Sequence, residues 1–409
     1  MHAAMPTSGA DSATLQWQRP ELQAWLRLAL TQGVGNAAAR RLLARFGSAQ
    51  AIFEESVSSL QECVSLAQAA QLRHLPEGFA QALATTWQWL HTPANDLAHD
   101  LITLGDPRYP SGLLQIADPP LMLYAVGDAR WLHLEQELVQ WERSLAVVGS
   151  RNPTPQGADH ARLFARNLAE QGWCIVSGMA LGVDAAAHEG ALEAAERHLD
   201  LLTVAVIGTG IDRVYPRQHK NLAHRIAQRG LMLSEFPLGT PPIATNFPKR
   251  NRIISGLSRG TLVIEAALAS GSLITARTAS EQGREVFAIP GSIHAPQSRG
   301  CHALIRQGAK LVESAQDILE EFPNQGQTLI QPGQAAIQQD KKVEPPRSAP
   351  LEPEHPLLQA MGHDPIGLDA LSARTGWGAA QLQAQLLELE LDGWLTRLPG
   401  GVFQRMARS

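Results

Sequence analysis

LAVVGS, at residues 145–150, is the first of seven short apolar runs that decide the fold of this 409-residue chain. Val- and Ile-rich runs that end in Gly or Ser are typical of parallel strands buried on both faces. Helical stretches such as 158–172 (ADHARLFARNLAEQG) separate most of them. This alternation predicts an α/β domain with a doubly wound, Rossmann-like parallel sheet. The other six runs are 173–178 (WCIVSG), 203–210 (TVAVIGTG), 231–237 (LMLSEFP), 261–266 (TLVIEA), 285–291 (EVFAIPG) and 310–314 (KLVES).

The flanks of this domain carry different patterns. The chain before residue 93 is helical in pattern, with glycines as punctuation, and 101–130 hold short extended runs that predict edge strands or docking segments. A Pro- and Gln-rich stretch predicts a flexible linker, and the last 54 residues predict three helices and a hairpin turning at Pro399-Gly400-Gly401, as in a winged helix. The predicted parts are a disordered N-terminus over 1–20, a helical domain over 21–100, the Rossmann-like domain over 101–322, a linker over 323–355 and a winged-helix domain over 356–409.

Composition excludes several classes of protein. The three cysteines, Cys63, Cys174 and Cys301, lie far apart, which excludes a disulfide scaffold and a cysteine-rich zinc site. The N-terminus lacks the features of a signal peptide, and no stretch approaches the roughly 18 apolar residues of a membrane-spanning helix. We therefore expect a cytoplasmic protein without a membrane partner.

The net charge of −5 is unevenly distributed along the chain. Residues 143–321 carry a balance of +3, whereas the remaining residues carry −8. A mildly basic centre between acidic flanks is compatible with nucleic-acid binding but does not establish it.

Candidate ligand-binding residues follow the predicted strands, because ligands of open α/β sheets bind outside the carboxyl ends of the strands. Glycines let a backbone approach an anion, and Ser and Thr hydroxyls add donors, so these loops could hold phosphates. The alternative is that Gly and Ser merely make tight turns. The candidates are Gly149, Ser150, Arg151, Ser177, Gly178, Gly208, Thr209, Gly210, Ser234, Glu235, Glu265, Ser270, Gly271, Ser272 and Pro290-Gly291-Ser292.

No cofactor is expected at these loops. Gly208-Thr209-Gly210 does not continue into the G-x-G-x-x-G pattern that opens a helix in dinucleotide-binding proteins. The Gly-Lys-Ser/Thr of a P-loop is missing from the sequence as well.

Residues 246–256 (NFPKRNRIISG) are the most informative stretch for function. Arg offers a planar fork for phosphates, and the ring of Phe247 offers a face on which a base could stack. We predict that Lys249, Arg250 and Arg252 bind phosphates, together with cations after other strands. The alternative is a solvated loop whose arginines pair with Glu235 or Glu265. The additional cations expected at the same edge of the sheet are Arg151, Arg217 and Lys220.

Three pairs of residues raise the question of catalysis or metal binding. Glu265 near Arg252 could orient a nucleotide sugar, although a structural role for each is favoured. Asp184 and His188 are four residues apart in one helix, but two ligands are too few for a metal site. Cys301-His302 has no identifiable third member of a triad. No catalytic residue and no metal ligand are predicted.

Six motifs follow one another in a fixed order along the chain. They are VGSRNPTPQG (148–157), VSGMALGVDAAAHEGAL (176–192), VIGTGIDRVYP (206–216), SEFPLGTPP (234–242), the stretch from NFPKRN at 246–251 to FAIPG at 287–291, and GCHALIRQGAKLV (300–312). This order of motifs resembles the DprA (Smf) family of DNA-processing proteins.

The resemblance implies an extended Rossmann fold that binds single-stranded DNA, loading of the recombinase RecA during natural transformation, and a homodimer formed through the Rossmann domain. No enzymatic activity is implied. The match also implies that Gly149-Ser150-Arg151 forms the DNA-binding loop of the family and that Arg217 is a basic contact. Lys249, Arg250 and Arg252 fall in its basic Asn-Phe-Pro segment, and Lys220 is the least secure of the transferred residues.

The flanking modules resemble the helix-hairpin-helix-like or sterile-alpha-motif-like domain and the winged helix of the same family. Gly33-Val34-Gly35 fits the hairpin pattern, and a structural or protein-contact role is favoured over DNA contact there. The expected recognition helix, 379–392, contains Glu388, Glu390 and Asp392 but no Lys or Arg, so a protein partner is favoured over duplex DNA.

Two alternatives from other classes remain. The Rossmann variant is similar to that of the lysine-decarboxylase-like nucleoside-monophosphate phosphoribohydrolases, with Arg252 and Glu265 as an incomplete version of their site. The third alternative is an interaction scaffold for which DNA binding is incidental.

Overall fold

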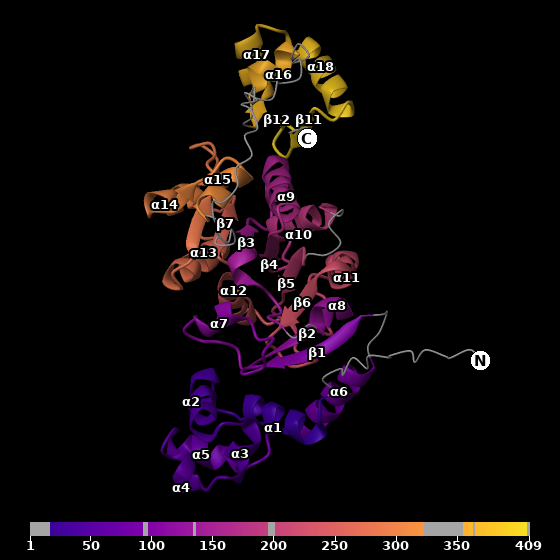
Figure 1. Cartoon of the computed structure of the whole chain (residues 1–409). Coiled ribbons are helices and arrows are strands. Elements are labelled where there is room, and N and C mark those ends of the chain that lie inside the picture. Colours follow the sequence, from indigo (N-terminus) through magenta and orange to yellow (C-terminus); the bar gives the residue numbers. More distant parts are fainter. Residues whose placement is uncertain are drawn as a thin grey trace, which may run out of the picture.

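The computed structural model describes residues 17–92, 97–133, 136–194, 201–322, 355–362 and 365–406. Three parts follow one another along its long axis: N-terminal helices, a sheet covered by helices, and a small C-terminal module (Figure 1). Most of the predicted disordered N-terminus, up to residue 16, and all but the last residue of the predicted linker over 323–355 lie outside the described residues. The first helix begins at Arg19, two residues before the predicted boundary of the helical domain.

A nine-stranded sheet forms the centre, in the order β1-β2-β6-β5-β4-β3-β7-β8-β9. The seven predicted runs are the seven parallel strands β3 to β9, which confirms the Rossmann-like interpretation. The short extended runs predicted over 101–130 correspond to β1 and β2, which form an antiparallel pair and join one side of the parallel sheet through β6. The strands are β1 (Ala98–Thr103), β2 (Met122–Gly127), β3 (Ser144–Gly149), β4 (Cys174–Ser177), β5 (Thr203–Val206), β6 (Leu231–Ser234), β7 (Gly260–Ile264), β8 (Glu285–Ala288) and β9 (Lys310–Leu311).

Helices cover both faces of the sheet, since successive side chains of a strand point to opposite faces. Leu145 and Val147 of β3 pack with α9, α10 and α15, whereas Ala146 and Val148 pack with the side of α7, α12, α13 and α14. These helices are α7 (Ser111–Leu114), α8 (Ala129–Leu132), α9 (Pro155–Glu170), α10 (Val183–Glu193), α11 (Lys220–Arg229), α12 (Asn246–Gly256), α13 (Ser272–Glu281), α14 (Arg299–Arg306) and α15 (Ala315–Glu320), with short 3-10 turns at η1 (Trp141–Arg143), η2 (Arg217–His219) and η3 (Pro296–Ser298).

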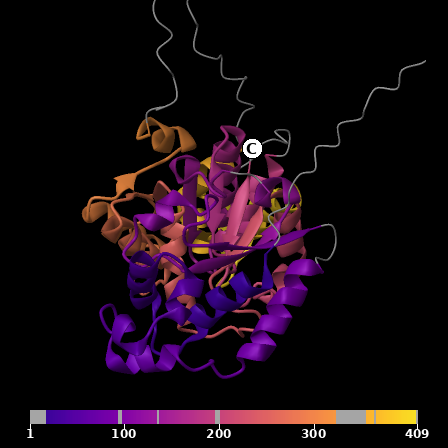
Figure 2. The same cartoon turned by 60° about the horizontal axis from the view of Figure 1, so that its bottom comes forward.

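The N-terminal helices share an apolar core with the sheet. Trp25 and Leu83 belong to the same buried cluster as Tyr124 of β2 and Met232 of β6. Figure 2 brings these helices forward and shows them beside the β1–β2 side of the sheet. They are α1 (Arg19–Leu30), α2 (Asn36–Phe46), α3 (Ala49–Glu54), α4 (Val57–Leu60), α5 (Leu66–Leu72) and α6 (Phe79–His91).

The C-terminal module has the predicted winged-helix order of three helices and a hairpin. Its own core includes Leu371, Leu386 and Phe403. The module lies on the N-terminal end of α9, where the Gln404 amide donates a 2.7 Å hydrogen bond to the Gln156 side chain. Its elements are α16 (Pro356–Met361), β10 (Ile366–Gly367), α17 (Leu368–Thr375), α18 (Ala379–Leu391), β11 (Leu395–Leu398) and β12 (Val402–Arg405).

Candidate nucleic-acid interface

The carboxyl ends of β3 to β8 meet at one edge of the sheet because these strands are parallel and in register. We call this edge the rim, and define it by the loops that follow the six strands. The chain runs from β3 outward to β6 and then returns to place β7 on the other side of β3. The topological switch point, where ligands of such sheets bind, therefore lies between β3 and β7.

The Gly149-Ser150-Arg151 loop turns at this switch point. A β-carbon at Gly149 would overlap the carbonyl oxygen of Ile264, so the close pairing of β3 with β7 requires glycine there. The backbone carbonyl of Ser150 accepts a 3.1 Å hydrogen bond from the amide of Val183, which fixes the loop to α10. Arg151 is exposed, and no described acidic side chain forms an ion pair with it. The loop therefore presents its cation to solvent.

The informative stretch 246–256 is a helix, α12, and not the solvated loop of the alternative prediction. Pro248 lies in the first helical turn, where a missing N–H costs no hydrogen bond. The helix divides its cations among three environments: Lys249 is exposed, Arg250 is buried, and Arg252 is half-buried in ion pairs. Only Lys249 of the three is open to a strand of nucleic acid.

Arg250 lies beneath the loop that follows β4. Its guanidinium contacts Gly178 so closely that a β-carbon there would overlap it. Asp184, at the start of α10, is near Arg250 and accepts hydrogen bonds from the amides of Gly178 (3.1 Å) and Ala180 (3.2 Å). Burial lowers the pKa of Arg250 to about 10, so that it remains charged at neutral pH, and burial raises the pKa of Asp184. This buried pair supports the rim from below.

Arg252 points to the N-terminal helices. Its guanidinium donates to Glu235 at 2.5 Å and to Asp118 at 3.3 Å. Asp118 also pairs with Arg40 at 3.2 Å, and the amide of Asn36 donates to both carboxylates. Arg252 therefore follows the alternative prediction, in which an arginine of this stretch pairs with Glu235 rather than with a phosphate.

The same cluster occupies the start of α2, just after the Gly33-Val34-Gly35 hairpin. Asn36, the first residue of α2, faces the carboxylates of Asp118 and Glu235. Negative side chains therefore lie at the helix end that would receive a phosphate in a hairpin-type DNA contact. A structural role of this hairpin is supported by these bonds.

An aromatic pair lies between the loops after β5 and β6. The ring of Phe247 contacts Gly208, and its centroid is 5.6 Å from that of Tyr215. Tyr215 is 48% exposed, and Arg217 follows it in the 3-10 turn η2. Our sequence reasoning missed Tyr215, although an aromatic residue two positions before a predicted contact could have indicated it.

The hydroxyls proposed as free donors are used inside the protein at two positions. Ser177 is buried and donates to the carbonyl of Val147 at 2.6 Å, and buried Thr209 donates to the carbonyl of Arg213 at 2.9 Å. Gly208 and Gly210 are buried with them. At these positions the alternative prediction holds, in which Gly and Ser or Thr only form tight turns. The hydroxyls of Ser177 and Thr209 stabilise the loops and do not face solvent.

Ser270-Gly271-Ser272, after β7, is a predicted phosphate loop that is accessible at Gly271, whereas Ser272 is buried. Gly271 is exposed, and the hydroxyls of Ser270 and Ser272 lie 2.7 Å apart. The loop precedes α13, whose N-terminal amides could receive an anion. It lies on the β7 side of the switch point, away from the loops after β5 and β6.

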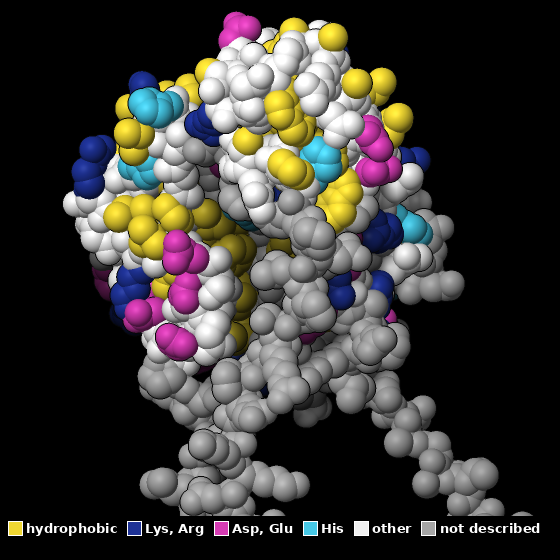
Figure 3. Space-filling model, turned by 90° about the horizontal axis from the view of Figure 1, so that it is seen from above, with side chains coloured by type: hydrophobic (Ala, Val, Ile, Leu, Met, Phe, Trp, Pro, Cys, Tyr) yellow, Lys and Arg dark blue, Asp and Glu magenta, His cyan; other side chains and the backbone are white. Residues whose placement is uncertain are grey.

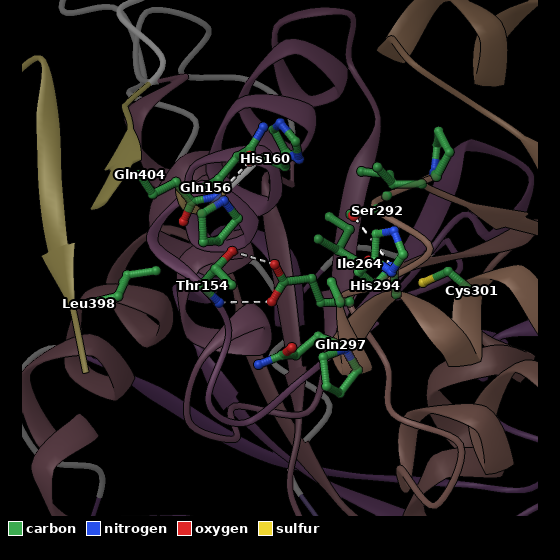
Figure 4. Close-up of a pocket in the computed structure, with 18 residues that line it drawn as sticks. Thr154, Gln156, His160, Ile264, Ser292, His294, Gln297, Cys301, Leu398 and Gln404 are labelled. Carbon is green, nitrogen blue, oxygen red and sulfur yellow. Dashed lines mark hydrogen bonds between the residues drawn. The ribbon is translucent and has the colours of Figure 1, made fainter. Parts of the chain in front are cut away.

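A cavity of about 380 Å³ lies between the rim and the winged-helix module (Figure 4). Glu265 sits at its base and accepts hydrogen bonds from the backbone amide and the hydroxyl of Thr154 at the start of α9. Burial raises the pKa of Glu265. None of the cavity's lining residues is Lys or Arg, so it lacks the cations that a phosphate-binding site needs.

The remaining predicted pairs are structural. His188 is buried and lies 2.7 Å from the hydroxyl of Thr203, while Asp184 binds loop amides. Cys301 is buried, and the ring of His302 bonds the carbonyl of Gly291. The described residues contain no cluster of three or more His, Cys, Asp or Glu side chains suited to a metal.

No helix in the described part of the chain has the length and apolar character needed to span a bilayer. Four of the exposed cations in the described chain lie at the rim, after β3, β5 and β6. They are Arg151, Arg217, Lys220 and Lys249, and none of them forms an ion pair with a described carboxylate.

Comparison with known proteins agrees with this architecture. The chain matches the DNA recombination-mediator protein A family over residues 100–323, the DprA winged helix domain over 341–401 and the DprA-like N-terminal HHH domain over 20–56. It is 39% identical to Protein Smf of Escherichia coli, with 87% of this chain and 88% of that protein covered.

A protein and a solved structure from Streptococcus pneumoniae support the same family assignment. The chain is 46% identical to the DNA processing protein DprA of Streptococcus pneumoniae over 53% of this chain and 72% of that protein. The X-ray structure of DprA from Streptococcus pneumoniae has a TM-score of 0.59 and 35% identity, with 75% of this chain and 99% of that chain covered. The chain therefore belongs to the DNA recombination-mediator protein A family, whose relatives carry the names DprA and Smf.

Proposed function

We propose that the chain binds single-stranded DNA through phosphate contacts along the rim and delivers the strand to the recombinase RecA, without chemistry of its own. The observation that carries this proposal is the set of exposed cations Arg151, Arg217, Lys220 and Lys249, none of which forms an ion pair with a described carboxylate. Separated cations on a backbone that is fixed by hydrogen bonds suit a ligand with regularly spaced phosphates.

The single strand is favoured over the duplex by two features. The rings of Phe247 and Tyr215 adjoin the cations and offer faces on which unpaired bases can stack. The helix in the position of a recognition helix, α18, contains no Lys or Arg, so groove reading is disfavoured there. Sequence preference is therefore expected to be weak, because phosphate contacts carry no sequence information.

The direct test is the fluorescence anisotropy of labelled oligo-dT and of a matching duplex, titrated with the full chain over a salt series. We expect tighter binding of the single strand, with an affinity that falls steeply as salt rises. Failure to bind oligo-dT at low salt would overturn the proposal.

Delivery to RecA rests on membership of a recombination-mediator family. The test is the assembly of RecA filaments on oligo-dT in the presence and absence of the chain. Faster assembly with the intact chain, but not with one that has lost its rim cations, is the expected result.

A homodimer through the Rossmann domain belongs to the same proposal. The β9 end of the sheet exposes apolar side chains, with Leu268 63% and Leu311 50% exposed. Leu268 and Ala309 line a common cavity there. Sedimentation of Leu311→Glu tests this edge, since a charge at a paired surface should shift dimers to monomers.

The phosphoribohydrolase alternative has less support. Arg252 is bound to Glu235 and Asp118, whereas Glu265 is bound to Thr154, so the two side chains have separate partners. The assay is release of free base from nucleoside monophosphates, and we expect none.

The scaffold alternative is tested by deleting residues 323–409. A chain whose function centres on DNA should keep its affinity for oligo-dT after this deletion. Loss of a protein partner together with retained DNA affinity would assign the C-terminal module to partner binding alone.

A further inference from the structure

The outer face of α18 is an apolar stripe that no other described part of the chain covers. Leu382, Leu386 and Leu389 point into the core of the winged-helix module. On the opposite side, Leu387 is 57% exposed and Leu391 is 79% exposed. Figure 3 looks down on this module and shows hydrophobic side chains on its surface close to acidic ones. An exposed pair of leucines one turn apart is a feature that a soluble surface helix does not need.

The stripe has the spacing of a coiled-coil seam. Ala380, Ala384, Leu387 and Leu391 are all exposed, and they follow one another at intervals of four, three and four residues. This alternation keeps the side chains on the line along which two helices pack with a small crossing angle. The seam runs from Ala380 to Leu391, which lie about 17 Å apart along the helix.

We propose that α18 pairs antiparallel with α18 of a second copy of this chain. In that orientation Leu391 faces Ala380 of the second copy, and Leu387 faces Ala384. Each large side chain then meets a small one, so the two helices can approach closely with the seam filled. A parallel pairing would instead place leucine on leucine at one end and alanine on alanine at the other.

The charges of α18 favour the same orientation. Glu388 and Glu390 flank the C-terminal half of the seam, and Gln381 and Gln383 flank the N-terminal half. Antiparallel pairing brings the carboxylates of one copy to the amides and to the positive end of the helix dipole of the other. Parallel pairing would set Glu388 beside Glu388 and leave like charges opposed.

The seam is small, because stable interfaces bury about 1,200–2,000 Å² and four side chains on each helix bury less. The contact therefore acts as a second link between copies rather than as the main dimer interface. A chain with two self-complementary surfaces, one on the Rossmann domain and one on α18, would join copies into larger assemblies. The α18 contact does not depend on DNA binding.

Disulfide trapping of full-length chains tests the pairing and its direction. Ala380→Cys and Leu391→Cys are made separately, each with Cys63→Ser to remove the half-buried native thiol. Antiparallel helices bring residue 380 of one copy to residue 391 of the other, so the mixture should give the mixed disulfide under mild oxidation. Each variant alone should form little disulfide, because the same position in the two paired copies is separated by about 17 Å along the helices.

The matched control mixes Ala380→Cys with Leu75→Cys, a site 62% exposed on the N-terminal helices. The proposal is overturned if the mixed 380–391 disulfide forms no more than this control, or if each variant prefers to cross-link to itself. A second measurement uses sedimentation of Leu387→Glu/Leu391→Glu, which should weaken the concentration-dependent association about tenfold. The paired change Leu66→Glu/Leu75→Glu should leave it unaltered.

Discussion

The guanidinium of Arg250 rests directly on the backbone of Gly178, with no room between them for a β-carbon. The carboxylate of Asp184 binds the amide of the same glycine at 3.1 Å. The loop after β4 is thus held by a cation from α12 and an anion from α10. Arg250, which the sequence predicted as a phosphate contact, is therefore part of the support beneath the rim.

Gly178→Ala tests this support. The added methyl group would displace Arg250, and overpacking of a buried site costs about 1–3 kcal/mol. We expect a lower midpoint of urea unfolding at an unchanged m-value. The control is Gly271→Ala on the same rim, where nothing lies within 4 Å of the added carbon and φ is −62°, so stability should be unaltered. Equal midpoints for the two variants would contradict the contact.

Arg151→Ala tests the exposed cation at the switch point. Since Arg151 is exposed and forms no ion pair with a described carboxylate, its removal should cost little stability. Affinity for oligo-dT should fall for all sequences alike, and the slope of log K against log [salt] should flatten by about 0.7 to 1. Anisotropy titrations at several salt concentrations measure both quantities. An unchanged slope would remove Arg151 from the interface.

The fold was predictable because strand and helix signals act locally. Apolar runs such as 145–150 carry their own period and their own Gly or Ser terminus. The alternation of strands and helices predicted that the loops after the strands lie together, since parallel strands end at one edge of the sheet. The antiparallel pairing of β1 with β2 could not be predicted from the sequence, because register between distant segments is set by tertiary packing.

The roles of the rim side chains were less predictable than their positions. Lys249, Arg250 and Arg252 are nearly adjacent in sequence, yet helical geometry turns them toward solvent, toward Gly178 and toward Glu235. A loop would have allowed all three to reach one phosphate strand. The helix therefore decides which cation remains available, and composition alone could not reveal it.

His188 predicts how stability depends on pH. Burial, together with the charges of Arg250 and His219, lowers the pKa of His188 to about 3. Between about pH 6.5 and pH 3 the unfolded chain therefore binds a proton that the folded chain excludes. The free energy of unfolding should fall by about 1.4 kcal/mol per pH unit on acidification through this range from this group alone.

His188→Asn removes that titration while keeping a donor near Thr203. Urea unfolding at pH 7 and pH 5 should show a smaller loss on acidification for this variant than for the parent chain. His74→Asn, at an exposed position, serves as the control and should leave the loss unchanged. The same loss in the His188 variant as in the parent would refute the assignment.

Lys249→Ala and Arg252→Ala form a matched pair on one helix and should behave oppositely. Lys249 is exposed, so its removal should flatten the salt dependence of oligo-dT binding and leave the urea midpoint unchanged. Arg252 is 15% exposed and satisfies Glu235, which is 16% exposed. Its removal leaves a largely buried carboxylate without its cation, which should lower the free energy of unfolding by about 1–3 kcal/mol and keep the salt slope.

Both measurements on both variants are needed, because a partly unfolded chain also binds DNA poorly. The urea midpoint shows whether the fold is intact, and the salt slope counts phosphate contacts independently of the fraction folded. If Arg252→Ala flattened the slope at full stability, Arg252 would contact DNA and the cluster with Glu235 and Asp118 would have to open on binding. If neither variant altered the slope, α12 would lie outside the strand's path, and the phosphates would run along the Arg151 and Arg217 side of the rim instead.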